Sequence, residues 1–255
     1  MALVRFVLAL LAALSLVSCG TPKTSSDKPT PKADPTINQP DTGTCWQMDN
    51  ITIAMYAPEA VPVDCSQPHN VMTLAVLKVG DSVDLSTGTA NPEFDAQSAQ
   101  CTQALNKELS MSADLGPADV HKTAFLTLPF LPNSASIVAG ARWAWCGVYV
   151  RNSSNPDGLE PLPAKFPLLE KGAIPRRFAS CVDKAYKIVS CSAPHKARHI
   201  TTVTFDKRPY PGRSWFVRRA EGCRIMTPVN RRYVALWSSK WEWKVGERYV
   251  SCFHN

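Results

Sequence analysis

The sequence contains no run of the roughly 18 to 20 apolar residues that a membrane-spanning helix needs, which excludes a polytopic membrane protein. It also lacks the Gly-x-Ser-x-Gly, His-Glu-x-x-His and Ser-x-x-Lys motifs of hydrolases in a setting that could support catalysis. Apolar residues nevertheless make up 45% of the 255 residues, so a packed core is possible and wholesale disorder is excluded. The length fits one large domain or two small ones.

The N-terminus has the pattern of an export signal. Arg5 precedes a short apolar stretch at residues 6–17, and a Leu-Val-Ser-Cys pattern then ends at Cys19. This pattern resembles a bacterial lipobox, so residues 1–18 are predicted to be a lipoprotein signal peptide. The resemblance implies cleavage before Cys19, lipidation of its sulfur and anchoring on the extracytoplasmic face of the cell membrane. An ordinary secretory signal, in which Cys19 is incidental, is the alternative.

Residues 19–44 are rich in Pro, Thr, Ser, Lys and Asp and contain almost nothing apolar. Such a segment buries too little surface to fold, so it is predicted to be a disordered tether between an acylated Cys19 and a folded body. Its three Lys and three Asp residues cancel, and the tether is therefore not a polybasic segment that holds the membrane by charge.

The eight cysteines after Cys19 form an even number behind an export signal, which predicts four disulfides. The motif Cys-Ser-x-Pro-His occurs twice and ends at His69 and His195. Each copy is preceded by one cysteine and followed by two, and each half closes on Gly-x-Arg-x3-Cys. Two motif pairs in the same order indicate an internal duplication.

Two copies that share a fold share a disulfide scheme, and three schemes are possible for each copy. We favour pairing the first cysteine with the second and the third with the fourth, because each pair closes a local loop. The predicted pairs are Cys45–Cys65, Cys101–Cys146, Cys181–Cys191 and Cys223–Cys252. Each bridge is worth about 2 to 4 kcal/mol in chain-entropy models, which matters for copies this small. Free thiols in a cytosolic protein are the alternative, and they conflict with the export signal.

Hydrophobic patterns predict the order strand, strand, strand, helix, strand, strand in both copies. The helices are expected at residues 94–109 and about 214–225, and the clearest strands at 71–79, 123–128, 142–150, 198–205, 233–237 and 248–253. The predicted fold class is α+β, with two tandem small disulfide-stapled repeats at residues 45–151 and 176–255. Each repeat is expected to be a mostly antiparallel sheet with one helix. Residues 152–175 hold five prolines and are predicted to be the linker.

The Cys-Ser-x-Pro-His motif, a helical cysteine and the closing Trp…Gly-x-Arg-x3-Cys together resemble the actinobacterial septum formation domain family. Residues 241–252 are similar to the closing signature of that family, and residues 45–46 with 65–69 are similar to its opening signature. The resemblance covers both predicted repeats, although the first two cysteines of the second repeat are unusually close. It implies a cell-envelope protein associated with the septum, and it implies no particular reaction or catalytic residues.

His69 and His195 are the candidates for site chemistry. A zinc site would combine two Cys-x3-His pairs, but zinc needs thiolates and these cysteines are predicted to be oxidised. Catalysis would need a partnered nucleophile and base, which the sequence does not offer. The favoured interpretation is that proline turns the chain and each histidine hydrogen-bonds the turn backbone beside a disulfide. No metal and no cofactor are therefore predicted.

Basic residues are concentrated in the second half of the chain. Residues 1–164 carry 9 basic and 15 acidic groups, whereas residues 165–255 carry 19 basic and 6 acidic groups. The predicted surface for an anionic partner consists of Arg176, Arg177, Arg208, Arg213, Arg218, Arg219, Arg231 and Arg232. An exported protein rarely meets nucleic acid, so the expected partners are an anionic lipid, a cell-wall polymer or an acidic envelope protein. A solvated surface, or docking against the acidic first half, is the alternative.

Two functional hypotheses follow from the sequence. The first is a membrane-anchored cell-envelope lipoprotein that acts as a non-catalytic binding or scaffold module, linked to septum formation or cell-wall assembly. The second is an envelope enzyme or metal-binding protein that uses His69 and His195. The surroundings of these two rings discriminate between the hypotheses, because a catalytic or metal site needs side-chain partners in an open cleft.

Overall fold

The computed structural model describes residues 33–55, 59–90, 93–116, 118–155, 158–172, 174–227 and 231–255. The predicted signal peptide, Cys19 and the tether up to residue 32 lie outside the described residues. Within the described part of the chain, no helix is long and apolar enough to cross a membrane. Residues Ala33–Asn255 belong to one compact unit.

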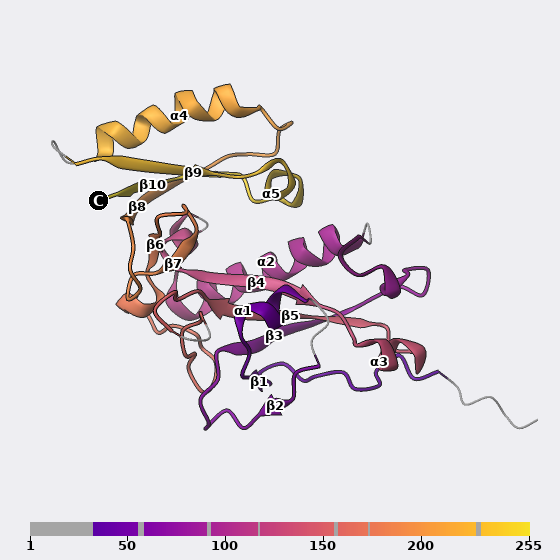
Figure 1. The fold of residues 1–255 in the computed structure, drawn as a ribbon. Coiled ribbons are helices and arrows are strands. Elements are labelled where there is room, and N and C mark those ends of the chain that lie inside the picture. Colours follow the sequence, from indigo (N-terminus) through magenta and orange to yellow (C-terminus); the bar gives the residue numbers. More distant parts are fainter. Residues whose placement is uncertain are drawn as a thin grey trace, which may run out of the picture. The chain divides into compact units, whose positions relative to one another are not determined.

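The first five strands form an antiparallel sheet in the order β2-β1-β3-β5-β4. They are β1 (Cys45–Trp46), β2 (Pro62–Val63), β3 (Val71–Lys78), β4 (Phe125–Phe130) and β5 (Trp143–Val150). The long helix α2 (Glu93–Ala113) connects β3 to β4 and packs across β3, β4 and β5 (Figure 1). Leu105 and Leu109 recur at helical spacing and fill the core between the helix and the sheet.

Strand β5 is buried along its whole length because both faces of the first sheet are covered. Helix α2 covers one face, and on the other face the Trp145 ring centroid lies 5.0 Å from that of Trp46 and 4.4 Å from that of Phe130. A strand that is covered on both faces has a continuous apolar run in its sequence rather than alternating apolar and polar residues. The Phe130 ring also packs directly on Gly147, where a Cβ atom would clash with it.

The last five strands form a second antiparallel sheet in the order β7-β6-β8-β10-β9. They are β6 (Ser180–Val182), β7 (Ile188–Ser190), β8 (Ala197–Thr204), β9 (Tyr233–Trp237) and β10 (Tyr249–His254). Helix α4 (Arg213–Met226) lies along β9 and β10 (Figure 1). The helix buries Phe216 and Cys223. Each strand takes the place that the strand five positions earlier takes in the first sheet. The α+β class with two equivalent antiparallel sheets is thus observed, and the equivalence agrees with an internal duplication.

The copies contain more helix than the single helix that we expected in each. The additional helices are α1 (Asn50–Ala54), α3 (Ser134–Val138) and α5 (Lys240–Val245), with 3-10 helices η1 (Leu85–Ala90), η2 (Asp119–Lys122) and η3 (Arg176–Phe178). Helix α5 begins with a capping box between Ser239 and Glu242 and ends at Gly246, whose φ of 108° is favourable for glycine. These capping signals favour a helix here, although aromatic residues in the segment are also common in strands.

Two segments that we expected to be extended or flexible instead pack on the first sheet. In the predicted tether, residues 33–44 are held by a 2.9 Å hydrogen bond from Trp143 Nε1 to the Ile37 carbonyl, and the Ile37 side chain joins the Trp46 cluster. In the predicted linker, four leucines are buried: Leu159, Leu162, Leu168 and Leu169. A few apolar side chains suffice to hold proline-rich chain against an open sheet face.

The second copy begins inside the core of the first. The Phe178 ring stacks on that of Phe125 with a centroid distance of 5.0 Å, and the Ala124 N–H donates to the Phe178 carbonyl at 2.7 Å. A further 2.8 Å hydrogen bond runs from the Ser190 N–H to the Arg151 carbonyl. At the N-terminal turn of α2, Asp95 forms an ion pair with Lys244 of α5, with 2.8 Å between Oδ2 and Nζ. Apolar packing, backbone pairing and one ion pair therefore join the two copies.

The cysteines pair in the scheme that we favoured from the sequence: Cys45–Cys65, Cys101–Cys146, Cys181–Cys191 and Cys223–Cys252. In each copy one bridge joins the first strand to the motif loop, and the other joins the long helix to an interior strand, β5 in the first copy and β10 in the second. The bridges close loops of very different length, with sequence separations of 45 for Cys101–Cys146 and 10 for Cys181–Cys191.

The difference in loop length predicts a difference in stability. Chain entropy gives about 4 kcal/mol for the longer loop and about 3 kcal/mol for the shorter one. We expect Cys101→Ala/Cys146→Ala to lower the free energy of unfolding more than Cys181→Ala/Cys191→Ala, by about 1 kcal/mol. The comparison is well matched because all four side chains are at most 1% exposed. Urea denaturation measures both values, and equal losses would show that loop entropy does not dominate.

Candidate anion-binding site

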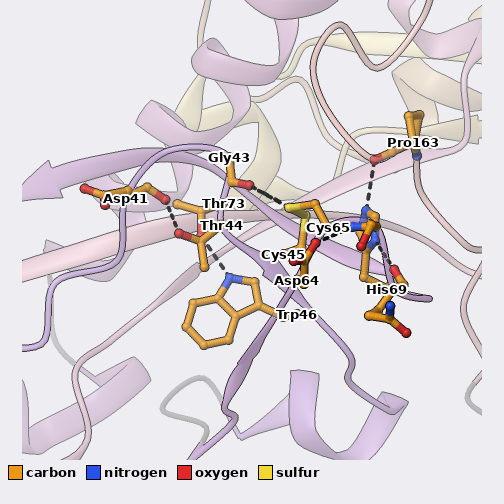
Figure 2. The surroundings of a disulfide bond; sticks show 12 residues. Asp41, Gly43, Thr44, Cys45, Trp46, Asp64, Cys65, His69, Thr73 and Pro163 are labelled. Atoms are coloured by element: carbon orange, nitrogen blue, oxygen red, sulfur yellow. Dashed lines mark hydrogen bonds between the residues drawn. A yellow bond between two sulfur atoms is a disulfide. The ribbon is translucent and has the colours of Figure 1, made fainter.

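His69 lies beside the Cys45–Cys65 disulfide, on the turn that leads into β3 (Figure 2). The residue is 4% exposed, its Nδ1 lies 2.9 Å from the Gln67 carbonyl oxygen and its Nε2 lies 2.9 Å from the Pro163 carbonyl oxygen. A neutral imidazole carries one N–H, so it donates to one of these carbonyls at a time. The ring thus connects the turn to the segment that crosses between the copies.

His195 occupies the equivalent place in the second copy. Its Nδ1 lies 2.8 Å from the Ala193 carbonyl oxygen, again two residues earlier in the chain. The ring is only half-buried, and it has no counterpart of the contact between His69 and Pro163 among its observed hydrogen bonds. The two histidines share no hydrogen-bond partner. Among the described residues, no group of three or more His, Cys, Asp or Glu side chains could hold a metal ion.

All eight arginines of the predicted anionic-partner surface are exposed, but the structure divides them. Arg208 and Arg219 flank Trp215, with guanidinium carbons 5.9 and 5.1 Å from the ring centroid. Arg213 and Arg218 lie on the same helix, α4, as Arg219. These four residues form the part of the predicted surface that belongs to α4 and the loop before it.

The other four arginines contact their own chain. The Arg176 Nε donates to the Cys191 carbonyl at 2.9 Å, and Arg177 lies over the Phe178 ring. Arg231 donates from a guanidinium nitrogen to the carbonyl of Asn255, and the backbone N–H of Arg232 donates to the Asn255 side chain. The predicted set is therefore spread over η3, α4 with the loop before it, and the residues before β9.

A cationic cavity in the second copy gathers basic residues that the sequence keeps apart. It has a volume of about 640 Å³ and lies between the loop before α4, helix α5 and the start of β10. Its basic lining residues are Lys207, Arg208, Lys240, Lys244 and Arg248. Tyr210, Trp243 and Pro209 complete the lining, which contains no carboxylate. Lys244 is paired with Asp95, which is not a lining residue, and the other four basic side chains have no acidic neighbour among the lining residues, so the cavity favours an anion.

The loop and the helix that form the cationic cavity are held together by Trp243. Its Nε1 donates to the Arg208 carbonyl at 2.7 Å, and its ring lies edge-on to Tyr210 at a centroid distance of 6.0 Å. Because Trp243 is buried, this hydrogen bond is shielded from water and fixes Arg208 against α5. The cavity is thus a built feature rather than a gap between mobile side chains.

Arg248 supplies the clearest sign of a missing partner. Its Nε atom is buried and makes no hydrogen bond in the described structure. Buried donors in native proteins are nearly always satisfied, and a charged donor is the costliest to leave unpaired. Arg248 is also one of the residues that line the cationic cavity. The residue belongs to the Gly-x-Arg-x3-Cys motif, so the sequence marked its position without indicating its role.

Lys244 is shared between the cationic cavity and the contact with the first copy. Its Nζ lies 2.8 Å from Asp95 Oδ2, and Trp241 Nε1 donates to the same carboxylate. The hydrogen bond from Lys244, supported by that from Trp241, lowers the pKa of Asp95. Sequence reasoning missed Lys240 and Lys244, because it did not predict the capped helix α5 that carries them to the cavity.

Comparisons with known proteins give no relative for this chain: no family model, no curated protein and no solved structure matches it. The resemblance to the septum formation family therefore rests on the motifs in the sequence alone.

The two motif histidines should contribute unequally to stability. His69→Ala removes a buried ring that contacts two carbonyls, and we expect a loss of about 3 kcal/mol in the free energy of unfolding. His195→Ala removes a half-buried ring with one such contact, and we expect about 1 kcal/mol. Chemical denaturation of the oxidised protein measures both. A functional assay that failed for either variant without loss of stability would instead indicate a chemical role.

Proposed function

We propose that this protein is a membrane-anchored cell-envelope lipoprotein that acts as a non-catalytic binding module for an anionic partner. The observation that carries the proposal is the cationic cavity, in which five basic side chains surround an aromatic lining. The unpartnered Nε of Arg248 supports it, because an anionic oxygen would satisfy a buried donor that is otherwise a net cost.

The proposed location rests on the chain outside the cavity. The lipobox-like pattern at Cys19 supports acylation, and a thioether-linked diacylglyceryl group provides stable anchoring where a single acyl chain gives only marginal binding. Four disulfides fit the oxidising environment beyond the cytoplasm. The motif resemblance supports a link to septum formation or cell-wall assembly.

The chemistry of the cationic cavity favours phosphate groups as the ligand. Arginine and lysine donate to phosphate oxygens, and a phosphate that enters a cavity of this size can place its attached group on the exposed parts of Tyr210 and Pro209. Anionic phospholipid headgroups and phosphate-bearing wall polymers share this chemistry. The contacts of His69 and His195 with backbone carbonyls give no support to the alternative of an enzyme or metal-binding protein.

Neutralising the cationic cavity should weaken binding to anionic membranes. The test uses residues 20–255 in oxidised form with vesicles of phosphatidylglycerol, and vesicles of phosphatidylcholine as the neutral comparison. Lys207→Gln/Lys240→Gln removes two cavity charges at about 1 kcal/mol each, so we expect about thirtyfold weaker binding in vesicle sedimentation. Binding of the unaltered chain should also weaken as salt is raised.

The matched control is Lys184→Gln/Lys187→Gln, which removes two exposed charges of the second copy outside the cationic cavity. This control should lose little affinity. Equal losses in the two double variants would show that the surface binds diffusely and that the cavity is not the site. Soluble polyphosphate is a second probe that separates phospholipid headgroups from wall polymers as the source of phosphate. If polyphosphate competes with the vesicles, the site recognises phosphate groups. If the protein binds polyphosphate but not the vesicles, the ligand is a wall polymer.

The anchor has its own test in cells. Cys19→Ala removes the sulfur that would be acylated, so we expect the mature protein to leave the membrane fraction and appear in the soluble or secreted fraction. The measurement is immunoblotting of fractionated cells, with the unaltered chain as the control. A Cys19→Ala protein that is exported and still sediments with membranes would rule out acylation as the means of attachment.

A further inference from the structure

A second cavity, with the opposite charge character, lies where the two copies meet within the compact unit. It has a volume of about 220 Å³ and is enclosed by α2, η2 and β4 of the first copy and by α5, the Glu247 loop and β10 of the second. We call it the acidic cavity. Its acidic lining residues are Glu242 and Glu247, and no Lys or Arg lines it.

The carboxyl group of Glu247 is held in surroundings that suit a cationic partner. Burial raises the pKa of Glu247, and the neighbouring Glu242 carboxylate raises it further, whereas Asn106 and Arg248 act in the opposite direction. The nearest observed basic group is His121, whose Nε2 lies 3.9 Å from Glu247 Oε2. Burial lowers the pKa of His121 to about 4, so this ring is uncharged at neutral pH and does not neutralise the carboxylate.

Two hydroxyl groups in the lining lack partners. Ser98, on α2, is 5% exposed, and its Oγ is buried without a hydrogen bond; the Oγ1 of Thr127, on β4, is also buried without one. Buried hydroxyls that make no hydrogen bond cost free energy unless a ligand or water occupies the space beside them. Both oxygens can accept a hydrogen bond from a donor in the acidic cavity.

The remaining walls are aromatic and aliphatic. The Tyr249 ring stacks obliquely on His121 with a centroid distance of 4.3 Å, and burial raises the pKa of the Tyr249 hydroxyl, so it stays protonated. Trp241, which is 41% exposed, stands among the lining residues with Asp95 as its hydrogen-bond partner. Leu105, Leu109 and other aliphatic side chains form the opposite wall. An aromatic ring beside a carboxylate is a favourable surface for an organic cation.

We propose that the acidic cavity binds a small primary ammonium ligand with an apolar body. The ammonium group would donate to Glu247 and Glu242 and to the unpartnered oxygens of Ser98 and Thr127, and the apolar body would lie on the leucine wall. The two carboxylates repel an anion, and a neutral molecule would make no charge-assisted hydrogen bond with them. This site is independent of the cationic cavity and does not rest on the anion-binding function.

Three six-carbon probes of equal chain length test the charge preference of the acidic cavity. Hexylammonium, 1-hexanol and hexanoate are titrated separately into oxidised residues 20–255 at one ionic strength, and protein-observed NMR reports affinity and location. We expect hexylammonium to bind at least about tenfold more tightly than 1-hexanol, and hexanoate to bind most weakly. Equal affinity for hexylammonium and 1-hexanol, or tighter binding of hexanoate, would overturn the proposal.

Glu247→Gln keeps the shape of the side chain and removes its charge. We expect at least about tenfold weaker binding of hexylammonium with unchanged binding of 1-hexanol, and no loss of melting temperature, because burial already disfavours the charged form. Glu170→Gln, at an exposed position outside the acidic cavity, is the matched control and should bind normally. Retained hexylammonium affinity in Glu247→Gln would contradict the assignment.

Filling the cavity tests whether the probes bind there at all. Ser98→Val adds a methyl group and removes the free hydroxyl, so it should abolish the binding of hexylammonium. If this variant does not fold, Thr127→Val removes the other free hydroxyl at equal volume and should weaken the binding of hexylammonium. Binding measured from about pH 5 to about pH 8 should also strengthen with rising pH, because a proton on Glu247 competes with the ammonium and burial raises the pKa of this carboxyl. Affinity that is constant over this range, or unaffected by filling, would count against the site.

Discussion

The disulfide between the long helix and an interior strand of the sheet is the constraint on which each half of this protein depends. In the first copy it joins α2 to β5, and in the second it joins α4 to β10. Helices of this kind would otherwise be held only by a narrow apolar face on a small sheet. The disulfide fixes the helix on this strand and thereby fixes the positions of the residues on the helix. In the first copy these residues include Ser98 and Asp95.

Much of this arrangement could be predicted from the sequence because it depends on repeated, strongly patterned features. Two copies of Cys-Ser-x-Pro-His and Gly-x-Arg-x3-Cys in one order indicated the duplication, a preference for local loops selected the disulfide scheme, and β-branched runs indicated the strands. What escaped prediction depends on neighbours that are distant in the chain. Residues 33–44 look too polar to fold, yet the indole N–H of Trp143 and a single isoleucine hold them in place. Similarly, the prolines of residues 152–175 concealed four buried leucines.

The candidate sites were the least predictable part. The arginine-rich surface was chosen by density along the sequence, and only Arg208 of that set lines the cationic cavity. Arg248 and Glu247 show why adjacency in sequence misleads: they are neighbours in the chain, but one lines the cationic cavity and the other lines the acidic cavity. Consecutive residues in extended chain point to opposite sides, so two chemically opposed sites can be built from a single dipeptide.

The position of Phe178 determines how separable the two copies are. Its ring belongs to the core of the first copy although its sequence belongs to the second, and its carbonyl satisfies the Ala124 N–H. A fragment cut at the apparent border would expose an aromatic ring on one piece and leave an unfilled hole in the other. The two copies are therefore parts of one packed unit and not separate domains. A substitution at the border of one copy should also change the stability of the other.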